Sequence, residues 1–348
     1  MQNLRHIPLE ELVLTLKEWK EPAFRANQIQ EWLWKKHVGS VEDMSNLPKS
    51  LRQKLSEHYF IRKVKVDHSQ FSNDGTIKNR LRLHDGQVIE SVLIPTEKRM
   101  TACVSSQAGC SLNCKFCATG YLKKGRNVDF DEIVDEVTLI NQQAIDHYGR
   151  PLTNIVYMGM GEPLLNYKNV LRSIDIITGA EGMGMSPRRI TVSTSGIAKM
   201  IKKLGDDEVR FKLALSLHSG NDKVRSDMMP FNDTNNIQSL VEALNYFYQK
   251  TKNEITLEYI LFKNLNDSVE AASELTKVYR QIPADLVNVI EYNAIDQADY
   301  AKSDAQTTQK FMNHLERNRV NARLRRSRGK DIDAACGQLA DINRQPEI

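Results

Sequence analysis

The first part of the chain carries apolar side chains at the spacing of amphipathic helices. Residues three and four apart share one face of a helix, so such a spacing predicts a buried stripe. Three helices are expected, with stripes formed by Leu9, Leu12, Val13 and Leu16, by Phe24, Ile29, Trp32 and Leu33, and by Leu47, Leu51 and Leu55. The run RLRLHDGQVIESVLIP is typical of a β-hairpin that turns at Asp85-Gly86. We therefore predict that residues 1–95 form an accessory helical domain with a hairpin.

From Thr101 onward, β-rich runs alternate with helical segments. The runs are TACVSS, NIVYMGM, RRITVSTS, RFKLALSLH, ITLEYILF and VNVIEYNAI, and the helical segments are FDEIVDEVTLINQQAID and others that begin near Asn166, Gly196, Asn236, Ser268 and Asp304. Such alternation predicts a parallel sheet covered by helices. Six units are too few to close an eight-stranded barrel, so residues 96–348 are predicted to form an α/β fold, a partial (β/α)6 barrel. Its active site should lie at the carboxyl ends of the strands.

The composition adds little, except for one basic segment near the end of the chain. The chain has 348 residues, is 41% hydrophobic and 26% charged, and carries a net charge of +4, which is an ordinary globular balance. Between Lys310 and Lys330 there are eight Lys or Arg residues and one acid, Glu316. A solvated face is the ordinary interpretation of such a run. Because the run leads directly to Cys336, it also favours polyanion binding close to the chemistry.

Nothing in the sequence indicates a membrane or an exported protein. No apolar run approaches the ~20 residues that a transmembrane helix needs. The first residues, MQNLRHIPLEELVLTLKEWK, lack the apolar stretch of a secretory signal. With free thiols in addition, we expect a cytoplasmic protein.

Three clustered cysteines, Cys110, Cys114 and Cys117, have the spacing C-x3-C-x2-C. Three thiolates on one loop can hold three irons of a [4Fe–4S] cluster and leave the fourth iron open for S-adenosylmethionine (SAM). A structural zinc site is the main alternative, but it needs four ligands, and the nearest histidines, His84 and His147, are distant in sequence. A disulfide framework is disfavoured because a long chain with five cysteines has an odd number of them.

Several loops after the predicted strands carry polar or glycine residues. GMGEP (residues 159–163) combines a carboxylate with glycines, which would let a ligand approach the backbone closely. The loops after the next strands offer Ser193, Ser195, Ser216, Leu217 and His218, and Asn293 follows the last of the six. Each residue alone would more often be a cap or a turn residue. Because these loops all follow the carboxyl ends of the strands, we predict that they meet at the opening of one pocket.

Two cysteines lie outside the cluster loop. Cys103 is on the strand that leads to the loop, and Cys336 lies in GKDIDAACGQLA. Lone cysteines are mostly small buried hydrophobes. Two thiols beside one pocket would also allow a nucleophile and a resolving partner.

The motifs together resemble the RlmN/Cfr family of radical SAM RNA methyltransferases. The resemblance covers almost the whole length: FRANQIQEWLW, CVSSQAGCSLNCKFCATG, GMGEP, VSTSG, SLH, EYN and RRSRGKDIDAACGQLA. It implies that Cys110, Cys114 and Cys117 bind the cluster, and that the SAM pocket is lined by Gly161, Glu162, Ser193 (or Ser195 in its place), Ser216, Leu217, His218 and Asn293. It further implies that Cys336 becomes S-methylcysteine, that Cys103 resolves the intermediate through a transient disulfide, and that Glu90 is the proton acceptor.

The resemblance implies methylation of carbon 2 of an adenosine in 23S rRNA and in the tRNA anticodon loop. A Cfr-type enzyme would modify carbon 8 instead, and Pro163 in GMGEPLLNY is similar to RlmN sequences. Other hypotheses remain: a non-enzymatic, metal-stabilised RNA-binding protein, or a radical SAM enzyme for a small metabolite. Expected partners are RNA, contacted by Arg323, Arg325 and Arg326 along its backbone, and a flavodoxin-type reductant. A monomer is expected.

Overall fold

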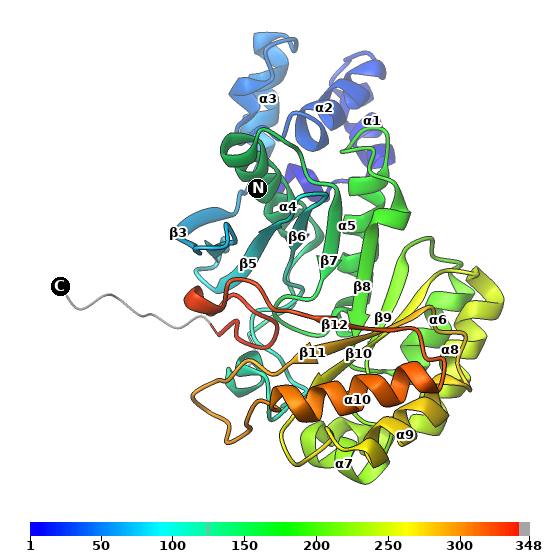
Figure 1. Cartoon of the computed structure of the whole chain (residues 1–348). Coiled ribbons are helices and arrows are strands. Elements are labelled where there is room, and N and C mark those ends of the chain that lie inside the picture. The colour runs from blue at the N-terminus through cyan, green and yellow to red at the C-terminus, as the bar shows by residue number, and fades with distance from the viewer. Residues whose placement is uncertain (124, 341–348) are drawn as a thin grey trace.

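The computed structural model describes residues 1–123 and 125–340, and its centre is a single ten-stranded sheet (Figure 1). The strand order is β12-β11-β10-β9-β8-β7-β6-β5-β4-β3. The parallel strands are β6 (Met100–Cys103), β7 (Asn154–Tyr157), β8 (Ile190–Thr194), β9 (Lys212–Ser216), β10 (Ile255–Leu261), β11 (Leu286–Glu291) and β12 (Ala322–Arg325). The six predicted runs are thus neighbouring parallel strands in chain order, and the basic run adds a seventh. The partial barrel is confirmed.

Helices connect the parallel strands on the outside of the sheet. They are α4 (Phe130–Tyr148), α5 (Tyr167–Thr178), α6 (Ala198–Asp206), α7 (Asp222–Met228), α8 (Ile237–Thr251), α9 (Val269–Tyr279) and α10 (Ala305–Arg317). The longest, α4, begins at a capping box in which Asp129 and Glu132 satisfy free backbone N–H groups, and it ends at Gly149 in the left-handed conformation. Only the short α7 was not predicted.

The predicted hairpin is present, but it extends the barrel sheet. Strands β3 (Lys65–Phe71), β4 (Ile77–Arg82) and β5 (Val88–Pro95) are antiparallel, and β5 pairs with β6. Gly86 turns the β4–β5 hairpin with φ +84°, a conformation that favours glycine. The barrel therefore continues directly into residues that the sequence grouped with the N-terminal helices.

The N-terminal helices are α1 (Leu9–Glu18), α2 (Phe24–Trp34) and α3 (Lys49–His58), with a two-stranded ribbon of β1 (Gln2–Asn3) and β2 (Tyr59–Phe60). Most of the residues in their apolar stripes are buried or partly buried, as predicted, but Leu9 and Phe24, the first residues of α1 and α2, are exposed. Buried ion pairs fix this unit to α4: Arg5 lies 2.9 Å from Asp135, and Arg62 lies 2.8 Å from Asp131. Breaking one partner of such a pair leaves an uncompensated charge, so the contact orients the unit firmly.

Within the described residues, no helix is both long enough and apolar enough to cross a membrane.

Candidate active site

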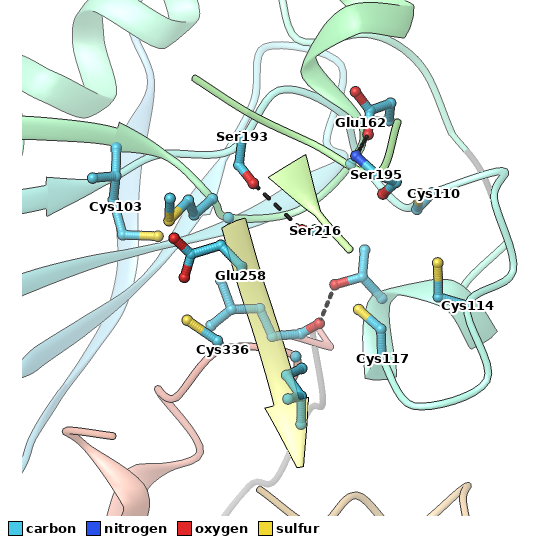
Figure 2. Close-up of a pocket in the computed structure, with 18 of the residues that line it drawn as sticks. Cys103, Cys110, Cys114, Cys117, Glu162, Ser193, Ser195, Ser216, Glu258 and Cys336 are labelled. Atoms are coloured by element: carbon cyan, nitrogen blue, oxygen red, sulfur yellow. Dashed lines mark hydrogen bonds between the residues drawn. The ribbon is translucent and has the colours of Figure 1, made fainter. Parts of the chain in front are cut away.

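One cavity at the carboxyl ends of the parallel strands is lined by all five cysteines. It encloses about 1190 Å³ of space outside protein atoms, part of which is open solvent at the mouth. Figure 2 shows two groups in it: Cys110, Cys114 and Cys117 lie on one side, and Cys103 and Cys336 on the other. Side chains more than 200 residues apart in sequence are therefore brought to one site.

The cluster loop directly follows β6 and turns back on itself. The Cys117 amide donates to the Cys114 carbonyl at 3.2 Å, and the Gly120 amide to the Cys117 carbonyl at 2.8 Å. A Cβ at Gly120 would lie 2.8 Å from the Cys114 carbonyl oxygen, so glycine is needed for this close turn. The neighbouring α7 steadies the loop, because the Met228 carbonyl accepts from the Lys115 amide at 3.0 Å.

The three thiols of this loop suit a metal cluster. Burial raises the pKa of Cys114 well above its ordinary value, and the nearby charges of Cys117 and Cys110 raise it further. Burial raises the pKa of Cys117 as well. Thiolates gathered in such a place need a positive partner, and bound metal supplies that charge. The donor set, three sulfurs beside an open cavity, fits a [4Fe–4S] cluster with one iron left for another ligand.

The GMGEP loop places Glu162 at the cavity wall. The Glu162 side chain is buried, and its two oxygens accept from the Ser195 amide at 2.8 Å and the Leu164 amide at 3.1 Å. Burial raises the pKa of Glu162, while these bonds lower it. The carboxylate therefore links the loop after β7 to the loop after β8.

The glycines of this loop line the cavity and also pack closely against a neighbouring segment. A Cβ at Gly161 would lie 2.4 Å from the Gln107 Cβ, and one at Gly159 would lie 2.7 Å from the Ser105 Oγ. On the Cβ side, the close approach is therefore to the chain that follows β6. Gly161 also has φ +91°, which favours glycine.

The serines and the histidine of the predicted SAM pocket meet at the cavity. Ser193, Ser195, Ser216 and His218 all line it, and the Ser193 and Ser216 hydroxyls lie 3.5 Å apart. Burial lowers the pKa of His218 to about 3, so the ring is neutral. Its Nδ1 accepts from the Ile260 amide at 3.2 Å.

The side chains of two predicted SAM residues lie outside the cavity lining. Leu217 is fully buried in the hydrophobic core, and its amide donates to the Glu258 carbonyl at 3.0 Å. The Asn293 Nδ2 donates to the Ser327 Oγ at 2.9 Å and to the Cys336 carbonyl at 3.5 Å. Among the described residues, neither side chain belongs to the cavity lining in this structure.

A buried arginine that the sequence did not single out supports these loops. Arg225, on α7, is fully buried. Its guanidinium donates to the carbonyls of Ser195 at 2.5 Å, Leu217 at 3.1 Å and Ser216 at 3.3 Å, and also to the Asn232 side chain. Burial lowers the pKa of Arg225 to about 10, and the charge of Cys114 is the largest effect that raises it. Arg225 therefore holds the loops after β8 and β9 together beside the cluster cysteines.

The C-terminal segment (residues 328–340) brings Cys336 to the cavity. The Gly337 carbonyl accepts from the Ala118 amide at 2.7 Å, and the Leu339 carbonyl accepts from the Thr119 hydroxyl at 2.5 Å. On the other side, the Ala340 amide donates to the Glu90 Oε2 at 3.0 Å. Glu90 is buried behind this segment, 3.6 Å from the Lys78 Nζ.

Cys103 faces Cys336 across the cavity from β6. Burial raises the pKa of Cys103, and the charge of Cys336 is the second cause. A thiol with a raised pKa stays protonated and is a poor nucleophile until its surroundings change. The two thiols are thus close enough to affect each other, and Cys103 is the more deeply buried of the two.

The arginines of β12 and Arg326, which follows it, do not share one role. Arg325 lines the cavity, and the charge of Cys336 is the main cause that raises its pKa. Arg323 is exposed and donates from Nε to the Asn288 Oδ1 at 2.7 Å. Arg326 is exposed on the opposite side, in a groove beside α10. Beside Arg325, the cavity is lined by Glu258 of β10, a buried carboxylate that the sequence did not single out.

Comparisons with known proteins give the family. The Radical SAM superfamily model matches residues 104–275, and the model of the ribosomal RNA large subunit methyltransferase N-terminal domain matches residues 2–61. Two curated relatives, from Flavobacterium psychrophilum and Christiangramia forsetii, are both named probable dual-specificity RNA methyltransferase RlmN. The first is 54% identical over 92% of each chain, and the second is 50% identical over 98% of this chain and 96% of its own. A solved structure, a radical SAM methyltransferase from Sphaerobacter thermophilus, is 38% identical with a TM-score of 0.91 and covers 97% of this chain and 99% of its own.

These findings decide between the hypotheses from the sequence. Radical SAM enzymes carry a [4Fe–4S] cluster and SAM, so a structural zinc site and a non-enzymatic RNA-binding protein are excluded. The relatives carry the RlmN name rather than that of Cfr-type enzymes. The chain is a radical SAM RNA methyltransferase and belongs to the RlmN family.

Proposed function

We propose that this enzyme methylates carbon 2 of adenosine in 23S rRNA and in the tRNA anticodon loop. The observation that carries the proposal is the single cavity shared by the three cluster cysteines and the pair Cys103 and Cys336. A cluster site alone would suit many radical enzymes, whereas a second thiol pair suits a methyl group carried on the protein. The dual-specificity name of the relatives supports both RNA substrates.

The residues are proposed to divide between two cofactors. Cys110, Cys114 and Cys117 would hold the [4Fe–4S] cluster, and SAM would be held by Gly161, Glu162, Ser193, Ser216, Leu217, His218 and Asn293, with Ser195 beside them. Leu217 and Asn293 would act through the backbone and through the C-terminal segment, since their side chains lie behind the wall. When bound, the two cofactors supply a carbon radical that can remove a hydrogen atom from an unactivated methyl group.

Cys336 is proposed to carry the methyl group. Its thiolate would form a sulfur–carbon bond with the methyl of SAM as the sulfonium bond breaks, because thiolates are strong nucleophiles. The methyl group on Cys336 would lose one hydrogen atom, and the resulting carbon radical would bond to the electron-poor carbon 2 of adenine. The adduct would then lose the carbon 2 proton and give its unpaired electron to an acceptor, for which the oxidised cluster is the available group. The Cys103 thiolate would attack the Cys336 sulfur and form a disulfide as the sulfur–carbon bond breaks, and the released carbon would take up a proton to complete the methyl group. Glu90, whose carboxylate holds the Ala340 amide, would accept the proton that leaves carbon 2.

The remaining proposals concern the partners, the oligomeric state, the cellular location and the domain bounds. Arg323 and Arg326 are proposed to contact RNA phosphates, since their side chains are exposed. A flavodoxin-type protein is proposed to reduce the cluster, and two accompanying proposals are a monomer and a cytoplasmic location. We also propose the division into an accessory domain (1–95) and a barrel with its C-terminal segment (96–348).

The test uses anaerobically reconstituted protein, which should be brown and hold about four irons per chain. It is incubated with SAM, dithionite and either unmethylated 23S rRNA or unmethylated tRNA. Mass spectrometry of the digested RNA then separates 2-methyladenosine from 8-methyladenosine. 2-Methyladenosine in both RNAs supports the proposal. Formation of 8-methyladenosine, or the absence of any methyladenosine with the cluster intact, contradicts it.

A further inference from the structure

The charged side chains that line the cavity differ in how many of their polar atoms have hydrogen-bond partners. Glu162 accepts two backbone hydrogen bonds, as described above. Glu258 has one occupied oxygen, which accepts from the Asn288 Nδ2 at 2.6 Å and the Thr256 hydroxyl at 3.3 Å. The other oxygen, Oε2, is buried and has no hydrogen-bond partner among the described residues. A buried acceptor left open in this way is costly unless something else binds it.

Arg325 completes this part of the wall. Its Nη1 lies 3.8 Å from the Glu258 Oε2, which is an ion pair but too long for a hydrogen bond. Among the described residues, no side chain or backbone group accepts a hydrogen bond from its guanidinium, and its remaining interactions are the charge effects of Cys336 and Cys103. A guanidinium presents its donors in a fixed planar fork. The cavity therefore contains a guanidinium with donors available for a ligand beside a carboxylate oxygen with no hydrogen-bond partner.

The pair lies where the carried carbon would meet the base. Arg325 is close enough to Cys336 and Cys103 that both thiols raise its pKa. In Figure 2, the Glu258 carboxylate lies toward Cys103 and Cys336, away from the three cluster cysteines. The donor and the acceptor thus face the thiol side of the cavity, away from Glu162 and the cluster loop.

We propose that Glu258 and Arg325 recognise the Watson–Crick edge of the target adenine, with Glu258 Oε2 accepting from the exocyclic N6 amine and Arg325 donating to N1. This inference rests on the proposed function, because it assumes that adenine enters the cavity. Enzymes that modify a base read the unstacked base by hydrogen bonds to this edge. Carbon 2 is bonded to N1, so a base held in this way presents carbon 2 beside its anchored nitrogen.

The same pair would reject guanine. Guanine has an oxygen where adenine has the amine, and an N–H where adenine has N1. Both contacts would then be reversed, with an acceptor facing the carboxylate and a donor facing the guanidinium. Sites built for a hydrogen bond discriminate strongly against a ligand that leaves their polar groups unpaired. The pair would therefore determine specificity for the base, whereas phosphate contacts determine affinity for the RNA.

The experiment measures RNA binding by the reconstituted enzyme with SAM and without reductant, so that no turnover occurs. Fluorescence anisotropy is recorded with one stem-loop RNA whose target base is adenine, purine (no N6 amine), 1-deazaadenine (no N1) or 7-deazaadenine (no N7). Loss of the amine or of N1 should each weaken binding about tenfold, as for a single base contact, and loss of N7 should have no effect. These comparisons need no variant, so they test the inference even if a variant fails to fold.

Variants then assign the contacts to side chains. Glu258→Leu should bind the adenine and purine RNAs equally, and Arg325→Met should bind the adenine and 1-deazaadenine RNAs equally. Arg326→Gln is the matched control: it should weaken all four RNAs alike, as loss of a phosphate contact does. If Glu258→Leu loses SAM affinity by more than tenfold while its preference for adenine persists, the carboxylate serves the cofactor and the inference is wrong.

The inference and the proposed function can fail separately. If 2-methyladenosine forms but wild-type enzyme binds all four RNAs equally, the function stands and the inference is wrong. If the 7-deaza RNA alone binds weakly and 8-methyladenosine forms, the pair reads the other edge, and both the carbon 2 assignment and the inference are overturned.

Discussion

Replacing Arg225 with methionine should damage the cavity without removing any residue that lines it. Arg225 donates to three carbonyls in the loops after β8 and β9 and to the Asn232 side chain. Methionine fills a similar volume but donates nothing, so these acceptors lose their partner inside the protein. Each hydrogen bond from a charged donor contributes about 1.5–3 kcal/mol. The buried charge itself is costly, as its pKa near 10 indicates, and its removal recovers part of that loss.

The net expectation is a loss of about 3–5 kcal/mol in the free energy of unfolding, typical of breaking a buried polar network. SAM affinity should fall at least tenfold, because the loops that carry Ser195, Ser216 and His218 are no longer held together. Arg225→Lys should lie between wild type and Arg225→Met, since an ammonium keeps the charge but cannot reach several carbonyls at once.

Urea unfolding of cluster-free protein, followed by circular dichroism, measures the first effect, and calorimetric titration of reconstituted protein with SAM measures the second. Arg210→Met is the matched control, because Arg210 is exposed and should change stability by less than about 0.5 kcal/mol. If Arg225→Met is as stable as Arg210→Met and binds SAM as wild type does, the supporting role assigned to Arg225 is wrong.

Three further predictions test single residues. Cys103→Ala should accumulate RNA covalently bound to Cys336, because no thiol remains to attack the thioether sulfur; a denaturing gel detects this adduct, and multiple turnover by the variant would remove Cys103 from the mechanism. Gly161→Ala should lower the unfolding free energy by about 2–3 kcal/mol, because its Cβ would collide with backbone and side-chain atoms at positive φ. Gly86→Ala is its control, since Gly86 has a similar φ in open space and should lose only about 1 kcal/mol; equal losses would reject the collision. His218 should destabilise the protein as pH falls, because the unfolded ring takes up a proton near 6.5 and the buried ring only near 3. Relative to His218→Gln, cluster-free wild type should lose up to about 1.4 kcal/mol per pH unit below 6.5, and parallel pH profiles would contradict this.

The fold could be predicted from the sequence because its periodicities are strong. The helical stripes and the β-rich runs became helices and strands at nearly the expected positions. The features that the sequence did not show have physical causes. The edge strand β3 (Lys65–Phe71) is mostly exposed and polar, so it lacks a buried face to signal it. The pairing of β5 with β6, which joins the hairpin to the barrel sheet, leaves no trace in a local pattern.

The site could be predicted only where its chemistry is local in sequence. The spacing of Cys110, Cys114 and Cys117 predicts a metal site by itself. The meeting of Cys103 with Cys336 depends on folding: the sequence left it as one of two interpretations, and the resemblance implied it. Arg225 and Glu258 look like ordinary surface charges in a sequence, because nothing local reveals that a charged residue is buried. One missed signal lies at the end of β12: adjacent residues of a strand point to opposite faces, so Arg325 turns inward while Arg326, which follows the strand, faces outward.

The sheet extension explains how Cys336 reaches its place. The C-terminal segment (residues 328–340) has little secondary structure of its own, so its position depends on contacts with other parts of the chain. Its backbone and side chains are held on one side by the β3–β5 region and on the other by the cluster loop, through the pairs Gly329–Asp74, Asp331–Ser72, Ala340–Glu90, Gly337–Ala118 and Leu339–Thr119.

If the segment that carries Cys336 were held only by its contacts with the cluster loop, the Cys336 thiol could move away from Cys103 on β6. Because the antiparallel strands continue directly from β6, the same sheet that places Cys103 also places the contacts that hold the Cys336 segment opposite it. One rigid sheet therefore positions residues that are far apart in sequence, as the proposed reaction between the two thiols requires. In that proposal the hairpin beyond the barrel belongs to the catalytic architecture, although its own side chains, apart from Glu90, take no part in the proposed chemistry.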